Sequence, residues 1–260
     1  MGILNVTPDS FSDGGQFSST QQAADYAIKM INDGADIIDI GGESTRPGAK
    51  PVPLEEELKR IQPVIKTIRE QTDCLISIDT YKASVAEVAL DLGADIINDI
   101  SSLSYDQNMA SIVSTRKTPI ILMHMQGSPQ NMQLDPNYNN LIDDLIFFFK
   151  NKIEIANKAG ILNNMIILDP GLGFGKHVED NFEIIRELKQ IKAMGYPILL
   201  GPSRKSFIGE ALKLPVKERL EGTLASIAVG IINGAKIVRV HDVLETKRTV
   251  LIVEKLLGEK

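Results

Sequence analysis

The chain has 260 residues, of which 43% are apolar and 24% charged, and its net charge of −6 argues against broad nucleic-acid binding, which needs a basic face. No apolar run reaches the roughly 18 residues of a membrane span, and no basic segment followed by an apolar stretch opens the chain, so we expect neither a membrane protein nor a secretory signal. The single cysteine, Cys74, excludes an internal disulfide and favours a reducing, cytoplasmic location.

Along the chain, short runs rich in β-branched residues alternate with longer segments of helical spacing. The runs are apolar at nearly every position, which is typical of parallel strands covered on both faces. They occupy residues 2–6, 36–40, 75–79, 95–99, 119–124, 165–169, 197–201 and 236–240. Strict alternation predicts a parallel sheet, and eight units favour a closed barrel over an open doubly wound sheet. The first loop also lacks the glycine pattern of a dinucleotide-binding sheet.

Three of the intervening segments carry clear helix signals, at residues 20–33, 54–71 and 141–159. The second opens with three glutamates at 55–57, where the helix dipole favours negative charge, and we interpret them as a solvated helix start. The third contains three phenylalanines at 147–149, which we interpret as packing residues.

A short pattern recurs where a predicted helix gives way to a strand. Gly34, Gly93 and Gly234 are each followed by alanine, a charged residue and two β-branched residues. Glycine ends helices readily in the left-handed region, so the repeat marks helix-to-strand joints at the bottom of a barrel. The whole chain, residues 1–260, is thus predicted to be a single-domain α/β protein, a (β/α)8 TIM barrel.

Polar residues stand where each predicted strand ends. They are Asn5, the segment GGESTRPG at 41–48, Asp79, Asn98 and Asp99, His124, Asp169, SRKS at 203–206 and RVHD at 239–242. A helix cap would explain any one of them, but eight cases at the same end of eight strands make capping a poor explanation. In this kind of barrel that end is the catalytic face.

The residue types bound the chemistry at that face. Asp79 and Asp169 can accept hydrogen bonds from a planar ligand rich in N–H groups, and Asn98 can both donate and accept. Lys205 adds a cation that can bond a ring carbonyl or nitrogen. These side chains together predict a site for a heterocycle.

A second set of residues suits a phosphate-containing group. Arg46, Arg239 and His241 form a potential anion clamp, since guanidinium groups bind phosphate with two hydrogen bonds. Asn5 is a neutral oxygen ligand that could complete the shell of a magnesium ion held mainly by phosphate and water. A heterocycle site beside an anion clamp suits the departure of pyrophosphate from a heterocyclic substrate.

Other site classes find little support. The three histidines lack the spacing of a zinc site, and neither a nucleophilic serine elbow nor a cysteine pair is present. The glycine-rich segment 171–176 has the wrong spacing for a Walker motif. We interpret it as a flexible loop that offers Phe174 as an aromatic contact.

In these residues the chain closely resembles the dihydropteroate synthase family over essentially its whole length. The matching motifs are GILNVTPDSFSDGG (2–15), GGESTRPG (41–48), SIDT (77–80), IND (97–99), MHM (123–125), DPGLGFGK (169–176), SRKS (203–206) and RVHD (239–242). All eight in this order are highly specific. One departure is that family members usually carry a short extension before the first strand, which here begins at residue 2.

The resemblance implies that 6-hydroxymethyl-7,8-dihydropterin pyrophosphate is joined to 4-aminobenzoate, giving 7,8-dihydropteroate and pyrophosphate in folate synthesis. By likeness, the pterin would be bound by Asp79, Asn98, Met123, Asp169 and Lys205. The pyrophosphate side would be bound by Asn5, Thr45, Arg46, Arg239 and His241, with Asn5 also a ligand of Mg²⁺. The aminobenzoate pocket, for which sulfonamides compete in this family, would be bordered by Phe11, Pro47, Phe174, Ser203 and Ser206.

The same resemblance implies a dissociative reaction, in which pyrophosphate leaves before the aromatic amine attacks the exocyclic methylene. The residues expected to take part in catalysis are Asp79, Asp169, Lys205, Arg239 and His241. A homodimer formed through barrel helices, the last ones among them, is also implied.

Two alternatives compete with this interpretation. One is a barrel that binds methyltetrahydrofolate for methyl transfer to a corrinoid, which would not need Lys205 or the pair of Arg239 and His241. The other is a non-catalytic barrel that stores or senses a pterin, in which the pyrophosphate residues would be superfluous.

Overall fold

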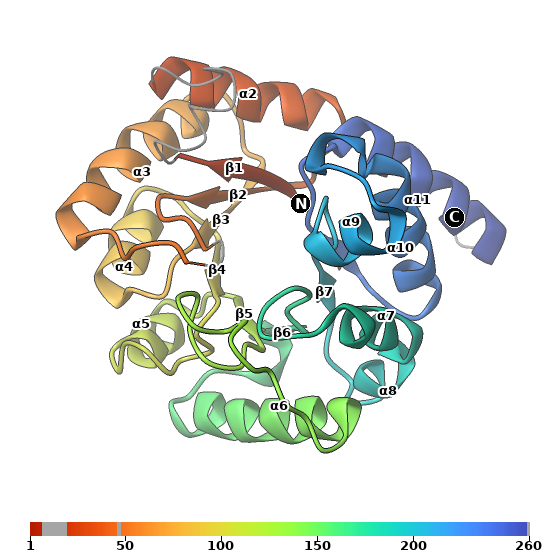
Figure 1. The fold of residues 1–260 in the computed structure, drawn as a ribbon. Helices are drawn as coiled ribbons and strands as arrows, with labels where there is room; N and C mark the ends of the chain where they lie inside the picture. Colours follow the sequence, from red (N-terminus) through yellow and green to blue (C-terminus); the bar gives the residue numbers. More distant parts are fainter. Residues whose placement is uncertain (7–19, 46–47, 259–260) are drawn as a thin grey trace.

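The computed structural model describes residues 1–6, 20–45 and 48–258. Figure 1 shows an inner ring of strands surrounded by helices. Within the described ranges the strands are β1 (Gly2–Asn5), β2 (Ile37–Gly41), β3 (Leu75–Asp79), β4 (Ile96–Asp99), β5 (Ile120–Met123), β6 (Ile166–Asp169), β7 (Leu199–Leu200) and β8 (Ile237–Val238).

The ring closes through two isolated pairings. Strands β1 to β6 form one parallel sheet in chain order, and β7 pairs in parallel with β8. Gly2 pairs with Val240 and Leu168 with Ile198, and these two parallel bridges join the sheets at both edges. Over the described part of the chain, the predicted eight-stranded barrel is therefore confirmed, and the open sheet is excluded because no edge is left unpaired.

Strands β7 and β8 are shorter than the five residues expected for each. Pro197 has no N–H to donate, so a regular ladder cannot run through it. Its carbonyl still accepts a hydrogen bond from Leu168 N at 2.9 Å. Pairing with β6 is thereby reduced to a bridge, which is enough to keep the barrel closed.

The helices of the described ranges cover the outside of this barrel (Figure 1). They are α2 (Thr20–Asn32), α3 (Leu54–Arg69), α4 (Ala83–Asp91), α5 (Met109–Arg116), α6 (Leu141–Lys158), α7 (Val178–Arg186), α8 (Leu188–Lys192), α9 (Ser206–Leu212), α10 (Leu220–Ile232) and α11 (Val243–Leu257), with short 3-10 turns at Asn163–Met165 and Val216–Glu218. None of these helices combines the length and the apolar character that crossing a bilayer requires. The predicted helix starts at residues 20, 54 and 141 are confirmed.

The joints between helices and strands also follow the prediction. Gly34 and Gly93 have φ angles of 104° and 98°, in the region that favours glycine. Each is the second residue after a helix, and the next strand begins three residues later. The phenylalanines of α6 differ in burial, because Phe149 is fully buried in the core whereas Phe147 is exposed. Packing was thus the right interpretation for Phe149 but not for Phe147.

Side chains along each strand point alternately outward, toward the helices, and inward, into the barrel. Ile38, Ile40, Ile76 and Ile78 are fully buried in the main core between strands and helices. A second, separate apolar cluster contains Ile37, Ile96, Ile167 and Ile237, one residue from each even-numbered strand. Such layers of four from alternate strands fill the interior of a (β/α)8 barrel. An apolar plug thus closes the inside of the barrel below the polar strand ends.

Periodicity then fixes what lies above the plug. Because side chains of a strand alternate between its two sides, residues two positions further along each even strand form the next inward layer. That layer consists of Asp39, Asn98, Asp169 and Arg239. Four isoleucines in one layer are thus followed by four polar residues in the next. We call this polar layer the floor of the site.

Glu57 corrects the interpretation of the glutamate cluster at the start of α3. Its side chain is only 1% exposed, and its carboxylate accepts hydrogen bonds from Lys82 and, at 2.9 Å, from the Thr80 hydroxyl. Lys82 also pairs with Glu43, which is buried at the base of the loop after β2. Burial raises the pKa of Glu57 although Lys82 opposes the shift. Through Lys82, the carboxylates of Glu57 and Glu43 link α3, the start of α4 and the loop after β2.

We expect Lys82→Met to lower the free energy of unfolding by about 3–5 kcal/mol near neutral pH, because it leaves two buried carboxylates without their cation. Urea denaturation measures this loss. The loss should shrink as the pH falls and the carboxylates take up protons. Lys59→Met, on the exposed side of α3, is the matched control and should change stability little. Equal effects of the two variants would contradict the role assigned to Lys82.

Candidate active site

The strand register brings five of the predicted residues, Asn5, Asp79, Asn98, Met123 and Asp169, to one rim of the barrel. Asn5 of β1 pairs with Gly41 of β2, Gly41 with Asp79 of β3, and Asp79 with Asn98 of β4. On the other side of the ring, Met123 of β5 pairs with Asp169 of β6. The sequence prediction that these residues share one end of the barrel therefore agrees with the register.

Arg239 reaches across the barrel from the end of β8. Its Nε donates to Asp39 Oδ2 at 2.6 Å, and its Nη2 donates to Asp79 Oδ2 at 2.8 Å. Burial lowers the pKa of Arg239, but the two carboxylates outweigh it, so that the pKa is raised. The sequence predicts Arg239 in an anion clamp, and in the structure its guanidinium binds two carboxylates, Asp39 of the floor and Asp79 at the end of β3.

Two buried oxygens beside this arginine have no hydrogen-bond partner among the described residues. They are Oδ1 of Asp79 and Oδ1 of Asn98. A buried polar atom without a partner costs free energy, so two on neighbouring strands need an explanation. Both are acceptors, and they belong to residues that pair across β3 and β4. A bound molecule with N–H donors along one edge would satisfy both.

Burial raises the pKa of the Asp79 carboxyl from its ordinary value of 3.8 to about 7, although Arg239 opposes the shift. The Asp39, Glu57 and Asp169 carboxylates add to the increase. Strong perturbation of a group in such a position is characteristic of functional sites. The raised pKa and the position of Asp79 are therefore those of a functional residue.

Asp169 and Lys205 occupy the opposite part of the rim. Asp169 Oδ1 accepts a hydrogen bond from Gly171 N at 2.7 Å, and burial raises the pKa of this carboxyl. Lys205 donates to the carbonyl of Leu172, and its Nζ lies 4.1 Å from the centroid of the Phe174 ring. Burial lowers the pKa of Lys205 to about 7, against the attraction of Asp169. A cation over an aromatic face thus borders the site on this side.

The loop at residues 171–176, which the sequence predicts to be flexible, makes hydrogen bonds to several neighbouring segments. Lys176 Nζ lies 3.0 Å from His124 Nδ1 and donates to Phe174 O at 3.0 Å. At Gly171 a Cβ would lie 2.0 Å from the carbonyl oxygen of His124. The loop therefore packs tightly on the end of β5, and this contact places the Phe174 ring.

His241 and Ser203 lie together at the ends of β8 and β7. Ser203 Oγ is 2.9 Å from His241 Nδ1 and accepts a hydrogen bond from His241 N at 3.1 Å. His241 is exposed and Ser203 is buried. Next to them, Arg204 binds Asp242 through two hydrogen bonds of 2.8 Å, which fastens one loop to the other. The sequence did not assign Arg204 or Asp242 a role.

For the remaining predicted residues, the structure gives a position but no contact within the site, or no description. Ser206 is the first residue of α9 and is exposed, and Thr45 is half-buried in the loop after β2. Three predicted site residues, Phe11, Arg46 and Pro47, lie outside the described residues. Of the five residues expected to border an aminobenzoate pocket, the structure describes Phe174, Ser203 and Ser206, which follow β6 and β7 in the chain.

Sequence reasoning missed Asp39, which lies in the floor with both Asn98 and Arg239. It stands in a run of isoleucines at 37–40, a pattern that indicates an apolar strand. The signal was available, because Asp39 lies two residues after Ile37, just as Asn98 lies two residues after Ile96. A charged residue at the inward positions of a barrel strand indicates a partner or a ligand.

Asn5 is the residue on which a magnesium ion was predicted. Its Oδ1 and Asp79 Oδ2 lie on either side of Gly41, 3.7 and 3.8 Å from where a Cβ would stand. Both are hard oxygen ligands of the kind that Mg²⁺ prefers. No group of three or more histidine, cysteine or acidic side chains in the described residues could hold a metal alone. The donor set thus fits an ion that takes most of its ligands from a bound phosphate group and water.

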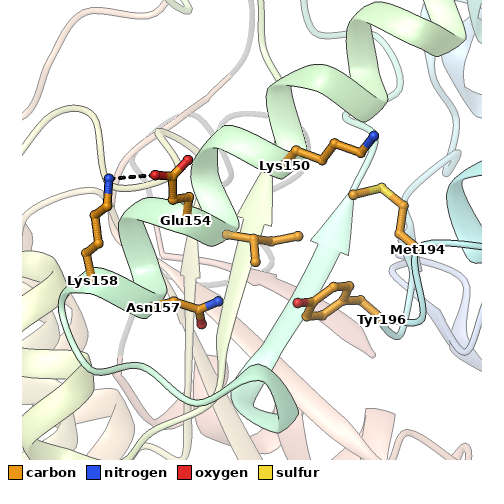
Figure 2. A pocket seen from close by; sticks show the side chains of 7 residues that line it. Lys150, Glu154, Asn157, Lys158, Met194 and Tyr196 are labelled. Atoms are coloured by element: carbon orange, nitrogen blue, oxygen red, sulfur yellow. Dashed lines mark ion pairs between the residues drawn. The ribbon is translucent and has the colours of Figure 1, made fainter.

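A groove of about 580 Å³ lies elsewhere, against the outer face of α6 and beside the loop before β7 (Figure 2). It is lined by Lys150, Ile153, Glu154, Asn157, Lys158, Met194 and Tyr196. Figure 2 shows Glu154 paired with Lys158, at 2.6 Å. None of the predicted site residues lines this groove. The chemistry at the strand ends, rather than the size of the groove, identifies the candidate site.

Comparisons with known proteins agree with this site. A family model described as pterin binding enzyme matches residues 1–241. A dihydropteroate synthase of Clostridium beijerinckii is 52% identical over 249 residues, which cover 95% of this chain and 90% of the relative. The similarity therefore spans every strand end described above.

Solved structures of the same kind superpose closely on the chain. The structure of Yersinia pestis dihydropteroate synthase with a sulfonamide drug complex has a TM-score of 0.96 and 44% identity, covering 99% of this chain and 94% of its own. The structure of Xanthomonas albilineans dihydropteroate synthase with 4-aminobenzoic acid has a TM-score of 0.93 and 38% identity, covering 100% and 93%. Identity at this level over nearly complete chains, on a shared barrel, leaves one assignment: this chain belongs to the pterin-binding enzymes, as a member of the dihydropteroate synthase family.

Proposed function

We propose that the protein condenses 6-hydroxymethyl-7,8-dihydropterin pyrophosphate with 4-aminobenzoate to form 7,8-dihydropteroate and pyrophosphate. The observation that carries the proposal is the pair of buried, unpartnered acceptors at Asp79 Oδ1 and Asn98 Oδ1. A pterin ring presents several N–H donors along one edge, which such acceptors would bind. The name of the relatives and the 4-aminobenzoic acid held by the Xanthomonas enzyme support the two substrates.

The roles of the residues follow from their positions. Asp79, Asn98 and Asp169 would hold the pterin, with Met123 beside it and Lys205 on its carbonyl side. Asn5, Thr45, Arg46 and His241 would contact the pyrophosphate, and Arg239 would join them when a ligand releases it from the floor. Phe174, Ser203 and Ser206, together with Phe11 and Pro47, would border the aminobenzoate.

The reaction we propose is a substitution at the exocyclic methylene carbon. The C–O bond to pyrophosphate breaks first, and Arg239 and His241 stabilise the negative charge that develops on the leaving group. The carboxylates of Asp79 and Asp169 stabilise the positive charge left on the pterin. The amine of 4-aminobenzoate then forms the C–N bond and gives up a proton to solvent.

Mg²⁺ is part of the proposal. Asn5 Oδ1 would be its protein ligand, with the remaining positions filled by pyrophosphate oxygens and water. When bound, the ion would neutralise charge on the leaving group. We also propose that residues 1–260 act as one pterin-binding domain and that the protein works in the cytoplasm, where a single free cysteine is compatible with the reducing conditions.

The test is to mix the protein with magnesium, pterin pyrophosphate and 4-aminobenzoate and to measure the pyrophosphate and dihydropteroate formed. We expect equal amounts of both products, and no dihydropteroate when 4-aminobenzoate is omitted. Pterin binding without pyrophosphate release would instead support a storage barrel. Methyl transfer from methyltetrahydrofolate to a corrinoid, without dihydropteroate formation, would support the corrinoid alternative.

The pH dependence of binding follows from Asp79, whose pKa is raised to about 7 by burial. Below that pH the carboxyl takes up a proton, so we expect pterin affinity to fall by up to tenfold per pH unit. The same shift makes the ligand-free protein lose stability as the pH rises from about 4 to about 7, because only the folded state retains the proton. Calorimetric titration between pH 5.5 and 8 measures the first effect. Constant affinity over this range would contradict the role of Asp79.

We propose that the protein forms a homodimer through α10 and α11, which lie side by side on the outside of the barrel (Figure 1). Their exposed faces carry Val229, Ile232, Leu251, Ile252 and Leu256, with exposed fractions from 45% to 81%. Exposed apolar side chains gathered on two adjacent helices are typical of an association site. The family resemblance favours a second copy of the chain as the partner.

If so, the double variant Ile252→Glu/Leu256→Glu should sediment as a monomer of about half the mass of the unaltered protein, because charge is placed in an apolar contact. Analytical ultracentrifugation measures the mass. Phe147→Glu, on the exposed side of α6, is the matched control and should leave the assembly unchanged. A monomeric unaltered protein at micromolar concentration would disprove the dimer.

A further inference from the structure

Asp39 is a fully buried carboxylate for which the proposed reaction has no use. It lies in β2 between Ile38 and Ile40, which face the helices, so its own side chain points into the barrel. Gly41, two residues later, is the last residue of that strand and pairs with Asp79, so Asp39 lies one inward position before the strand end. A buried charge costs several kcal/mol unless it is paired, so its position calls for a role.

One oxygen of Asp39 receives two donors from the site. Oδ2 accepts from Arg239 Nε at 2.6 Å and from Asn98 Nδ2 at 3.2 Å, while Oδ1 lies 3.5 Å from the same amide nitrogen. All three residues belong to the same inward layer of the barrel. Asp39 therefore binds two residues that are assigned to substrate binding.

The contact decides which way the Asn98 amide faces. An ionised carboxylate only accepts hydrogen bonds, so Asn98 must turn its NH₂ group toward Asp39. Its Oδ1 then points away, and this is one of the two unpartnered acceptors of the site. With the amide reversed, Asn98 would present a donor to the N–H-rich edge of the ligand.

The contact with Arg239 acts on Asp79 in the same way. Because Asp39 binds Nε, the guanidinium is held with Nη2 against Asp79 Oδ2. The other oxygen of Asp79, Oδ1, is left without a partner. The contacts of this one carboxylate thus leave an acceptor without a partner on each of two neighbouring strands.

We propose that Asp39 is a positioning residue that sets the hydrogen-bonding polarity of the heterocycle site: it orients Asn98 and Arg239 so that Asn98 and Asp79 both present acceptors. The ligand selected is a heterocycle with adjacent N–H donors, and one with acceptors at the same edge is rejected. The inference rests on the proposed pterin site and deepens it.

The test measures the Kd of 6-hydroxymethylpterin, a ligand without pyrophosphate, for the full chain and its variants by calorimetry. In Asp39→Leu, which has a similar shape but cannot accept, we expect the Kd to rise about 10- to 100-fold, since a hydrogen bond to a charged group has roughly that value. In Asp39→Asn we expect at most about a tenfold rise, because both donors share one oxygen that an amide can replace. A smaller rise in Kd for Asp39→Asn than for Asp39→Leu would show that residue 39 acts as a hydrogen-bond acceptor and does not merely fill space.

Kinetics give a second readout. The KM for pterin pyrophosphate should rise in Asp39→Leu. The KM for 4-aminobenzoate should stay within about twofold, because the described residues proposed to border it, which follow β6 and β7, make no contact with Asp39. Asp99→Asn is the matched control: Asp99 is equally buried but binds only the Ser101 and Leu103 segment of its own loop. It should lower the unfolding temperature and leave the pterin Kd unchanged.

If Asp39→Leu does not fold, a second pair of variants, Asn98→Asp alone and Asn98→Asp combined with Asp39→Asn, still tests the proposal. Asn98→Asp sets two carboxylates against each other and should weaken pterin binding. Adding Asp39→Asn restores a donor facing an acceptor, so the double variant should bind the pterin more tightly than Asn98→Asp alone. Failure of this recovery, or an unchanged Kd in a folded Asp39→Leu, would overturn the role of Asp39. Absence of pterin binding by the unaltered protein would instead refute the proposed function.

Discussion

Asp79→Asn should lower kcat/KM for pterin pyrophosphate by about 10²–10³-fold. Hydrogen bonds to a charged group are worth roughly 1.5–3 kcal/mol each, and every 1.36 kcal/mol is tenfold in rate. The amide offers a weaker acceptor and also loses the charge that stabilises a pterin cation. Steady-state kinetics with each substrate varied in turn measures the effect. Because part of the loss is in ground-state binding, the pterin KM should rise while kcat falls.

The matched control for this variant is again Asp99→Asn, a buried carboxylate on the neighbouring strand that faces its own loop. It should retain kcat/KM within a few-fold once its lower stability is allowed for. Near-normal kcat/KM in a folded Asp79→Asn would show that the acceptors of the site do not bind the pterin, and the assignment would then be wrong.

Arg239→Ala combines a loss of activity with a loss of stability. Removing one preorganised cation from a developing oxyanion typically costs 10²–10³ in kcat. The variant also leaves Asp39 and Asp79 buried without their cation, and breaking a buried pair costs about 3–5 kcal/mol. We therefore expect both a lower kcat and a lower free energy of unfolding, with the second effect smaller at acidic pH.

Arg69→Ala separates the two effects. Arg69 has the same 20% side-chain exposure as Arg239 and also binds an aspartate, Asp95, but it fastens the end of α3 at the bottom of the barrel. Its substitution should lower stability alone, as measured by urea denaturation beside single-turnover kinetics. If Arg239→Ala kept its kcat while losing stability, Arg239 would have only a structural role, and the leaving group would need another cation.

Much of this site is predictable from the sequence because barrel geometry repeats locally. Residues alternate along each strand, and the strands end at one face, so the positions of Asp79, Asn98 and Asp169 in the chain are enough to assign them to a common rim. The same periodicity contains Asp39, two residues beyond Ile37. It escapes notice because a run of isoleucines suggests a wholly apolar strand.

The amino-acid pattern alone is enough to establish the closed barrel, the face that carries the chemistry and the residue types that bind a heterocycle. Which side chains meet across the ring became clear only from the folded chain. Arg239 binds Asp39 and Asp79, on strands far away in the chain, and Ser203 lies against His241. Glu57 is buried rather than solvated because Lys82 of a neighbouring unit reaches it. Such pairs depend on the reach of long side chains between elements, which local spacing does not encode.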